Sequence, residues 1–182
     1  MTDKSEQSEL NEIIRQTLNG NEQAFRLIFE RHVDALFRFL HQFSKSSEEL
    51  DDWVQRAFIR AYERLNQFDS NARFEPWLFQ IGINEMRTDR RRAKIVQFIP
   101  AGDQPSLEPV FEEQFEWSIT MKDIMLTLDE NKRMVFTLHE VEGFTHKEIA
   151  SMLQITESHS RSILMRTKQE LRTHWNDERK VQ

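Results

Sequence analysis

The sequence of 182 residues contains no cysteine. This absence excludes disulfide bonds, thiolate zinc sites, iron–sulfur clusters and cysteine nucleophiles, and it favours a cytoplasmic protein. Glycine and proline are also scarce, with four residues of each. Because all-β folds and phosphate-cradling α/β folds use more of both, the sequence predicts an all-α protein.

Long apolar runs are missing as well. No stretch approaches the roughly 20 apolar residues of a membrane-spanning helix, and the polar, acidic segment 1–10 is unlike a secretory signal peptide. No Walker or dinucleotide-binding glycine motif occurs, and His139-Glu140 followed by His146 lacks the spacing of zinc hydrolases. We therefore expect no metal, cofactor, catalytic residue or small-molecule substrate, and no enzymatic activity.

Basic residues are absent from segment 96–117, which carries five acidic residues and three of the four prolines. Residues 1–95 carry 15 basic and 16 acidic side chains, and residues 118–182 carry ten of each. The net charge of −6 therefore arises almost wholly in segment 96–117, whose composition is typical of a linker. The sequence predicts an N-terminal helical domain (1–95), an acidic flexible linker (96–117) and a C-terminal helical domain (118–182).

Apolar residues in the N-terminal domain recur with the 3.6-residue period of helices. The residues predicted to cap these helices are Gly20, Asn21, Ser46 and Glu49. Residues 66–75 break the period and predict a loop, after which Pro76 fits the first turn of another helix. That helix ends in a basic run, residues 87–94, with five positive charges and one negative charge.

The C-terminal domain contains a helix-turn-helix pattern. A short helix with Ile149, Ala150 and Leu153 is followed by a tight turn and a longer helix. The predicted caps are Asp129, the Thr145–Glu148 capping box and Thr156. The second helix of such a unit enters the major groove with its N-terminal residues. The candidate contacts to duplex DNA are Glu157, Ser158, His159, Arg161, Ser162, Met165, Arg166 and Lys168. The alternative is a plain helical hairpin within a bundle.

The predicted loop combines aromatic with polar side chains, which together can stack on unpaired bases and hydrogen-bond to their edges. The candidate residues are Phe68, Asp69, Ser70, Asn71, Arg73 and Phe74. The alternative is that the rings fill the core beneath the loop, which is the interpretation we favour for Trp77. The basic run 87–94 suits DNA phosphates, but it equally suits a solvated helix end, where cations complement the helix dipole.

Acidic side chains also cluster, at residues 48–52. Paired carboxylates can serve catalysis or bind a metal, but no histidine or nucleophile pattern accompanies this cluster. Asp51 and Asp52 share their predicted helix with Gln55, and this grouping favours an exposed surface that meets a protein partner.

Two stretches resemble the extracytoplasmic-function (ECF) sigma factors, the two-domain initiation factors of bacterial RNA polymerase. The first, from Glu48 to Lys94, includes EELDDWVQRAFIRAYERLNQF and FEPWLFQIGINEMRTDRRRAK. The second, from Leu128 to Arg172, reads LDENKRMVFTLHEVEGFTHKEIASMLQITESHSRSILMRTKQELR. The order and spacing of the two stretches agree with the family. The resemblance implies a non-enzymatic protein that binds core RNA polymerase, directs it to promoter DNA and promotes transcription initiation.

The resemblance also implies roles for particular residues. The contacts to the clamp helices of the polymerase β′ subunit would be Leu50, Asp51, Asp52 and Gln55, and the C-terminal domain would meet the β flap. The loop would capture a base flipped out of the −10 element. The further −10 contacts would be Asn84, Arg90, Arg91 and Arg92. The helix-turn-helix would read the −35 element as duplex, and the acidic linker would thread toward the active-site cleft and the RNA exit channel.

The chain departs from the family pattern around its recognition helix. Gln154 stands where the family commonly has a turn glycine, and residues 159–163 read HSRSI where the family commonly shows Thr-Val-Lys-Ser-Arg. The strength and sequence of −35 recognition therefore stay open, as do the inducing signal, the oligomeric state and control by an anti-sigma factor, which is common in the family. Two other interpretations are a stand-alone helix-turn-helix regulator, which would normally dimerise, and a helical decoy that binds a sigma factor's partners without reading DNA.

Overall fold

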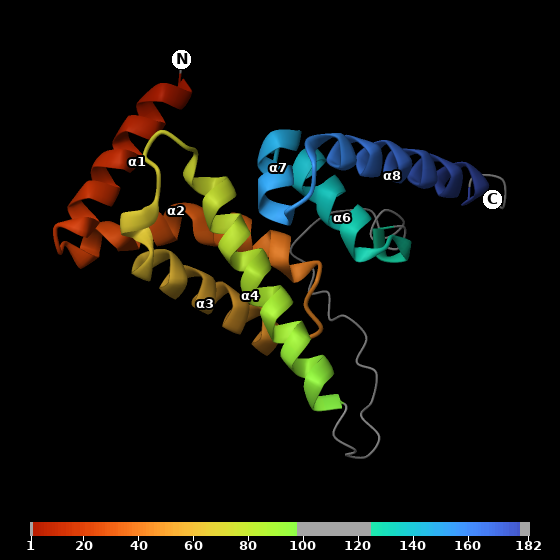
Figure 1. Cartoon of the computed structure of the whole chain (residues 1–182), viewed down its shortest axis with the longest axis horizontal. Helices are drawn as coiled ribbons and strands as arrows, with labels where there is room; N and C mark the ends of the chain where they lie inside the picture. Colours follow the sequence, from red (N-terminus) through yellow and green to blue (C-terminus); the bar gives the residue numbers. More distant parts are fainter. Residues whose placement is uncertain (1, 98–124, 179–182) are drawn as a thin grey trace. The chain divides into compact units, whose positions relative to one another are not determined.

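The computed structural model describes residues 2–97 and 125–178, and every regular element in these two ranges is a helix (Figure 1). The predicted all-α class is confirmed for this part of the chain. The chain divides into two compact units, which we call the N-terminal unit (Met1–Val110) and the C-terminal unit (Phe111–Gln182). Nearly all of the predicted linker, 96–117, lies outside the described residues, so its flexible character stays a prediction.

The N-terminal unit is a helical bundle. Its elements are α1 (Thr2–Leu18), α2 (Glu22–His41), α3 (Ser47–Glu63), the 3₁₀ turn η1 (Leu65–Gln67) and α4 (Phe74–Gln97). The Asn21 side chain accepts a hydrogen bond from the Gln23 N–H, and the Ser46 hydroxyl accepts one from the Glu49 N–H, so both predicted caps are confirmed. The Glu49 carboxylate accepts from the Lys45 N–H (2.7 Å), one residue before the cap itself.

The core of the N-terminal unit lies where α4 packs against α2 and α3 (Figure 1). Its fully buried side chains include Trp53, Phe39, Phe79, Ile28 and Leu36. Gly82 allows α4 to approach α2 closely, because a Cβ at this position would lie 2.9 Å from Leu36 Cδ1.

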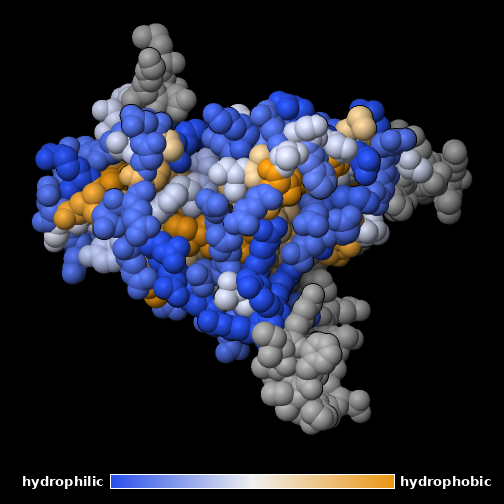
Figure 2. All heavy atoms as spheres, viewed as in Figure 1, coloured by the Kyte–Doolittle hydropathy of each residue, from blue (hydrophilic) through white to orange (hydrophobic). Residues whose placement is uncertain are grey.

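On the face shown in Figure 2, apolar residues reach the surface as separate patches among polar ones. None of the described helices is long and apolar enough to cross a membrane.

The C-terminal unit contains the predicted helix-turn-helix. Its elements are α6 (Glu130–Phe136), which widens into a π-helical turn η2 (Thr137–Val141), then α7 (His146–Leu153) and α8 (Glu157–Glu178). The Asp129 carboxylate caps α6, and Thr145 and Glu148 form a complete capping box on α7. The Thr156 hydroxyl accepts from the His159 N–H at 3.1 Å and so caps α8. The three predicted starts of these helices are therefore correct.

The turn between α7 and α8 contains a non-glycine residue in the left-handed conformation. Gln154 has φ 58° and ψ 45°, and the following Ile155 N–H donates to the Ala150 carbonyl at 3.0 Å. This hydrogen bond pattern ends many helices and favours glycine at the left-handed position. The turn geometry is therefore the one that the family's common glycine would adopt, although this chain has a glutamine there.

We expect Gln154→Gly to raise the free energy of unfolding. Relief of left-handed strain, about 1–2 kcal/mol, exceeds the added entropy of a glycine, about 0.5–1 kcal/mol, so the net gain should be about 0.5–1 kcal/mol. Urea unfolding of the full chain measures it. The control is Gly143→Ala: Gly143 has φ +71° and open space at its Cβ position, so the loss of stability there reports backbone strain alone. No gain in the Gln154 variant would mean that the turn is unstrained.

Candidate functional site

The exposed face of α3 carries three of the four residues predicted to bind polymerase. Asp51, Asp52 and Gln55 are exposed, whereas Leu50 is only 1% exposed and packs in the core beside Trp53. Leu50 therefore anchors the helix and does not offer its side chain to a partner in this structure. The result is a rigid helix that presents two carboxylates and an amide to solvent.

A polar network joins α3 to α4 beneath this face. The Asp89 carboxylate accepts from the Trp53 indole Nε1 and from Arg56 Nη2, both at 3.2 Å. Arg90 donates from Nη2 to the Phe43 carbonyl, and its guanidinium lies 5.6 Å from the centre of the Trp53 ring. Asp89 and Arg90, both from the basic run 87–94, thus hold the bundle together.

The other predicted −10 contacts on α4 have different surroundings. Arg91 and Arg92 are exposed, so their charges are available to phosphates, and Asn84 is exposed nearer the middle of the helix. The neighbouring Glu85 lies 3.5 Å from Arg60 of α3. Of the three arginines predicted to hold promoter backbone, Arg90 is the one engaged with protein groups in the described contacts.

The loop between η1 and α4 forms a tight turn over an aromatic cluster. The Asp69 carboxylate accepts from both the backbone N–H and the side-chain amide of Asn71, each at 2.9 Å. The tip residues Asp69, Ser70, Asn71 and Arg73 are all exposed. Below them the Phe68 ring packs at 5.3 Å from the rings of both Phe74 and Trp77.

The two phenylalanines of the loop take different positions. Phe74 is 0% exposed and begins α4, so Pro76 lies in the first turn of this helix as predicted, while the loop ends two residues before the predicted end at residue 75. A fully buried ring has no free face for a base, so in this structure Phe74 forms the floor of the loop, packed against the rings of Phe68 and Trp77. Phe68 and Trp77 are half-buried, and each therefore keeps part of its ring accessible.

His32 of α2 lies beneath the same cluster and was not singled out by the sequence. It is 5% exposed, its ring packs 5.2 Å from that of Phe74, and its Nδ1 lies 3.9 Å from Glu75 Oε1. Burial lowers the pKa of His32 below its ordinary 6.5, with Glu75 opposing the shift and Arg31 adding to it. His32 Nε2 is buried without a hydrogen-bond partner, which agrees with a neutral ring.

We expect the stability of the chain to fall as the pH drops below 6.5. The unfolded chain protonates His32 near its ordinary pKa, whereas the folded chain protonates it only at lower pH. The contribution of the neutral His32 ring to the free energy of unfolding is therefore complete above pH 6.5. It is then lost at up to about 1.4 kcal/mol per pH unit until the folded pKa is reached. Urea unfolding between pH 7 and pH 5 should show a shallower slope for His32→Gln than for the wild type. His159→Gln, at an exposed position, is the control, and equal slopes for all three proteins would contradict the assignment.

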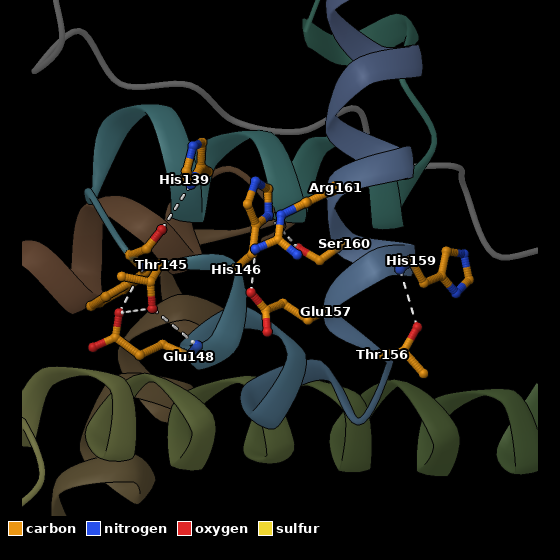
Figure 3. Close-up of polar contacts among 10 residues, drawn as sticks. His139, Thr145, His146, Glu148, Thr156, Glu157, His159, Ser160 and Arg161 are labelled. Carbon is orange, nitrogen blue, oxygen red and sulfur yellow. Dashed lines mark hydrogen bonds and ion pairs between the residues drawn. The ribbon is translucent and has the colours of Figure 1, made fainter.

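In the C-terminal unit the predicted duplex-reading residues lie along the first turns of α8. Figure 3 labels three of them, Glu157, His159 and Arg161. The exposed members of the set are Ser158, His159, Arg161, Met165 and Arg166, while Glu157, Ser162 and Lys168 are partly buried. Arg161 donates to the Glu157 carboxylate one turn earlier, and Lys168 Nζ lies 2.8 Å from Glu140 of η2. Two of the predicted cations thus have acidic partners within the unit.

A histidine pair lies behind this face. The His146 ring stacks on His139 at 4.4 Å, and His146 Nδ1 lies 2.9 Å from the hydroxyl of the fully buried Ser160 (Figure 3). Burial lowers the pKa of His146, and the neighbouring His139 and Arg161 lower it further. The stacking joins η2 to α7, and the contact of His146 with Ser160 joins α7 to α8. Within the part of the chain that the structure describes, no group of three His, Asp or Glu side chains could hold a metal ion.

Sequence reasoning also missed two contacts between α1 and the loop. Asn11 Nδ2 donates to the Ser70 carbonyl at 3.0 Å, and Gln7 Nε2 donates to the Ala72 carbonyl at 3.4 Å. Each pair is separated by about sixty residues in the chain, a range over which local periodicity carries no information.

The chain thus consists of two compact helical units, one of which contains a helix-turn-helix, a motif typical of multidomain DNA-binding proteins. The family models Sigma-70 region 2 and Sigma-70 region 4 match residues 28–95 and 120–171. The sequence is 32% identical over 163 residues to the RNA polymerase sigma factor NccH of Alcaligenes xylosoxydans xylosoxydans, covering 84% of this chain and 86% of the relative. It is 25% identical to the ECF sigma-E factor of Escherichia coli, covering 91% and 93%.

Solved structures give the same result. The chain matches CnrH in complex with the cytosolic domain of CnrY with a TM-score of 0.66 and 25% identity, covering 91% of this chain and 96% of that one. The fold also matches that of RpoE of Bartonella quintana in complex with the anti-sigma factor NepR, with a TM-score of 0.71, 20% identity and coverage of 84% and 96%. The chain belongs to the ECF sigma factors of the sigma-70 family. It is a non-enzymatic initiation factor of RNA polymerase that recognises promoters through regions 2 and 4.

Proposed function

We propose that the exposed face of α3 binds the clamp helices of the polymerase β′ subunit. The support is that Asp51, Asp52 and Gln55 are exposed on a helix whose opposite face is fixed by buried Leu50 and Trp53. A pre-ordered helix of this kind loses little conformational entropy when a partner helix docks on it. This observation carries the proposal for the polymerase contact, and the C-terminal unit would contact the β flap.

The loop at residues 68–73 would capture an unstacked base of the −10 element. Its support is the exposed polar tip above the partly accessible rings of Phe68 and Trp77, since aromatic rings and polar groups together hold flipped bases. Asn84, Arg91 and Arg92 would add contacts to the same strand from α4. Arg90 and Phe74 would support the site from within the fold.

The first turns of α8 would read the −35 element in the major groove, with Arg161 and Arg166 as the main readers. The free chain should bind promoter duplex weakly, because residues 118–182 carry ten basic and ten acidic side chains and Arg161 is paired with Glu157. In the complex with polymerase this weak binding would suffice. Both DNA contacts are then held on one large molecule, so that once one contact forms, the other becomes effectively intramolecular.

The remaining expectations are also proposals. The functional boundaries would be 1–95 for polymerase and −10 binding, 96–117 for the acidic linker and 118–182 for −35 binding. An anti-sigma factor is proposed as a further partner, because the similar protein RpoE was solved with the anti-sigma factor NepR. Because the protein would bind RNA polymerase, we place it in the cytoplasm.

The experiment is a pull-down of purified bacterial core polymerase by the full chain. The wild type should bind, and the double variant Asp52→Ala, Gln55→Ala should lose at least tenfold in affinity, because it removes a charge and an amide from the proposed contact. The matched control is Glu12→Ala with Gln16→Ala, which removes an exposed acid and an exposed amide from α1. Equal binding by all three proteins would place the polymerase contact elsewhere.

A further inference from the structure

Helix α1 reaches the loop through two side-chain amides one turn apart. Asn11 Nδ2 donates to the Ser70 carbonyl (3.0 Å) and Gln7 Nε2 to the Ala72 carbonyl (3.4 Å). Gln7 Nε2 also lies 3.1 Å from Asn11 Oδ1, so the two amides form one connected group. The loop backbone is thus held at residues 70 and 72 by a helix that lies about sixty residues earlier in the sequence.

The helix that supplies these amides is itself well fixed. Leu10 and Ile14 are 3% and 5% exposed and pack α1 into the bundle on α2. Glu9 adds an ion pair to Arg31 of α2 at 3.6 Å. Asn11 is only partly exposed, next to the buried Leu10. The donors therefore come from a rigid support, which is what a loop needs if its position is to be precise.

The loop has few other restraints on its tip. Within the tip, Asp69 accepts from Asn71, and the Ala72 N–H donates to the Asp69 carbonyl at 2.9 Å. These bonds shape the turn but do not tie it to the bundle. The ring of Phe68 fixes the start of the loop, and the buried Phe74 fixes its end. Arg73 Nε also lies 3.8 Å from Glu75 Oε2 at the start of α4. The two contacts from α1 are the described hydrogen bonds that tie residues 70 and 72 to another helix.

We propose that α1 is a positioning element for −10 recognition, with Gln7 and Asn11 as positioning residues that set the path of the loop before DNA arrives. This inference rests on the proposed role of the loop in base capture. Ordering the tip in the free protein removes a cost that binding would otherwise carry. It also fixes where the exposed side chains of Ser70, Asn71 and Arg73 meet the DNA strand.

The test variant is Gln7→Met with Asn11→Leu, which removes both donors, adds no charge and retains good helix formers. The matched control is Gln16→Met with Asn19→Leu, the same two replacements at exposed positions near the other end of α1. A single variant, Asn11→Ala, repeats the test with the smaller change. Hydrogen exchange of the α3 and α4 amides in each protein verifies that the bundle is intact.

The first measurement is amide hydrogen exchange of the free full chain. Loss of the two hydrogen bonds should speed exchange of residues 69–73 by about fivefold to tenfold, with α3 unchanged and the control like the wild type. The second measurement uses each protein with bacterial core polymerase to select DNA from a library randomised at the −10 and −35 elements. The −10 preference should weaken several-fold while the −35 preference stays the same.

The outcomes separate the inference from the function on which it rests. A further variant, Ser70→Ala with Asn71→Ala, alters the loop tip directly. If that variant changes the −10 preference and the α1 variant does not, the positioning role is wrong and base capture by the loop stands. If neither changes it, base capture is wrong as well. Unchanged exchange of residues 69–73 in the α1 variant would overturn the positioning role whatever the selection shows.

Discussion

Replacing Phe74 with alanine is expected to lower the free energy of unfolding of the N-terminal unit by about 3–5 kcal/mol. Phe74 is completely buried, and its ring lies between 5.2 and 5.4 Å from the rings of His32, Phe68 and Trp77. Removing it takes away the transfer free energy of a phenyl group and leaves a cavity that these rings can fill only in part. Urea unfolding of the full chain, followed by circular dichroism, measures the change.

The same variant should weaken −10 recognition, because Phe68 loses the surface on which it packs. Phe74→Leu is the control: it keeps most of the apolar volume, so it should retain most of the stability that alanine loses. A loss below about 1 kcal/mol for Phe74→Ala would show that the neighbouring rings move to fill the cavity with little loss of free energy. In that case Phe74 would not be the floor that the loop requires.

Asp89→Ala is expected to destabilise the N-terminal unit by about 1–3 kcal/mol, because it leaves a buried donor and a partly buried cation without their acceptor. The two groups are the Trp53 indole N–H and the Arg56 guanidinium. Both Arg56 and Asp89 keep about a third of their side-chain surface exposed, so solvent screening holds the loss to the lower part of this range. Urea unfolding at neutral pH measures it.

The variants Asp89→Ala and Asp89→Asn together distinguish a structural role of Asp89 from a purely electrostatic one. Asp89→Asn keeps an oxygen acceptor for the indole and removes the charge, so it should cost less than alanine. If Asp89 served only to dilute the positive charge of the run 87–94, both variants would keep full stability and bind DNA more tightly. Equal stability of the three proteins would therefore overturn the structural role.

Local chemistry made the helix boundaries predictable. Asn21, Asp129, Thr145 and Thr156 each accept a backbone hydrogen bond at the helix start where the sequence placed them. A cap depends on residues two or three positions away, so the sequence alone contains both partners. The helix-turn-helix follows for the same reason, since its turn and both caps lie within a dozen residues.

The candidate site was harder to predict wherever a side chain's partner lies on another helix. Arg90 is predicted to bind promoter backbone, and it also donates to the Phe43 carbonyl, 47 residues away, a contact that the sequence did not indicate. Leu50 and Phe74 lie among other predicted contact residues in the sequence, yet both are buried in the core. Whether a residue at the edge of a helical face is buried depends on which helix packs against that edge. The 3.6-residue pattern of one segment does not specify its neighbouring helix.

The amides of α1 bond to carbonyl oxygens of the loop and to none of its side chains. Every amino acid offers the same carbonyl, so residues at the tip can be exchanged without loss of these two anchors. The path of the loop and the chemistry of its surface are thus encoded in different parts of the chain. With the proposed role of the loop in base capture, such a separation would let base preference diverge by substitution at the tip, while the scaffold that presents the tip stays unchanged.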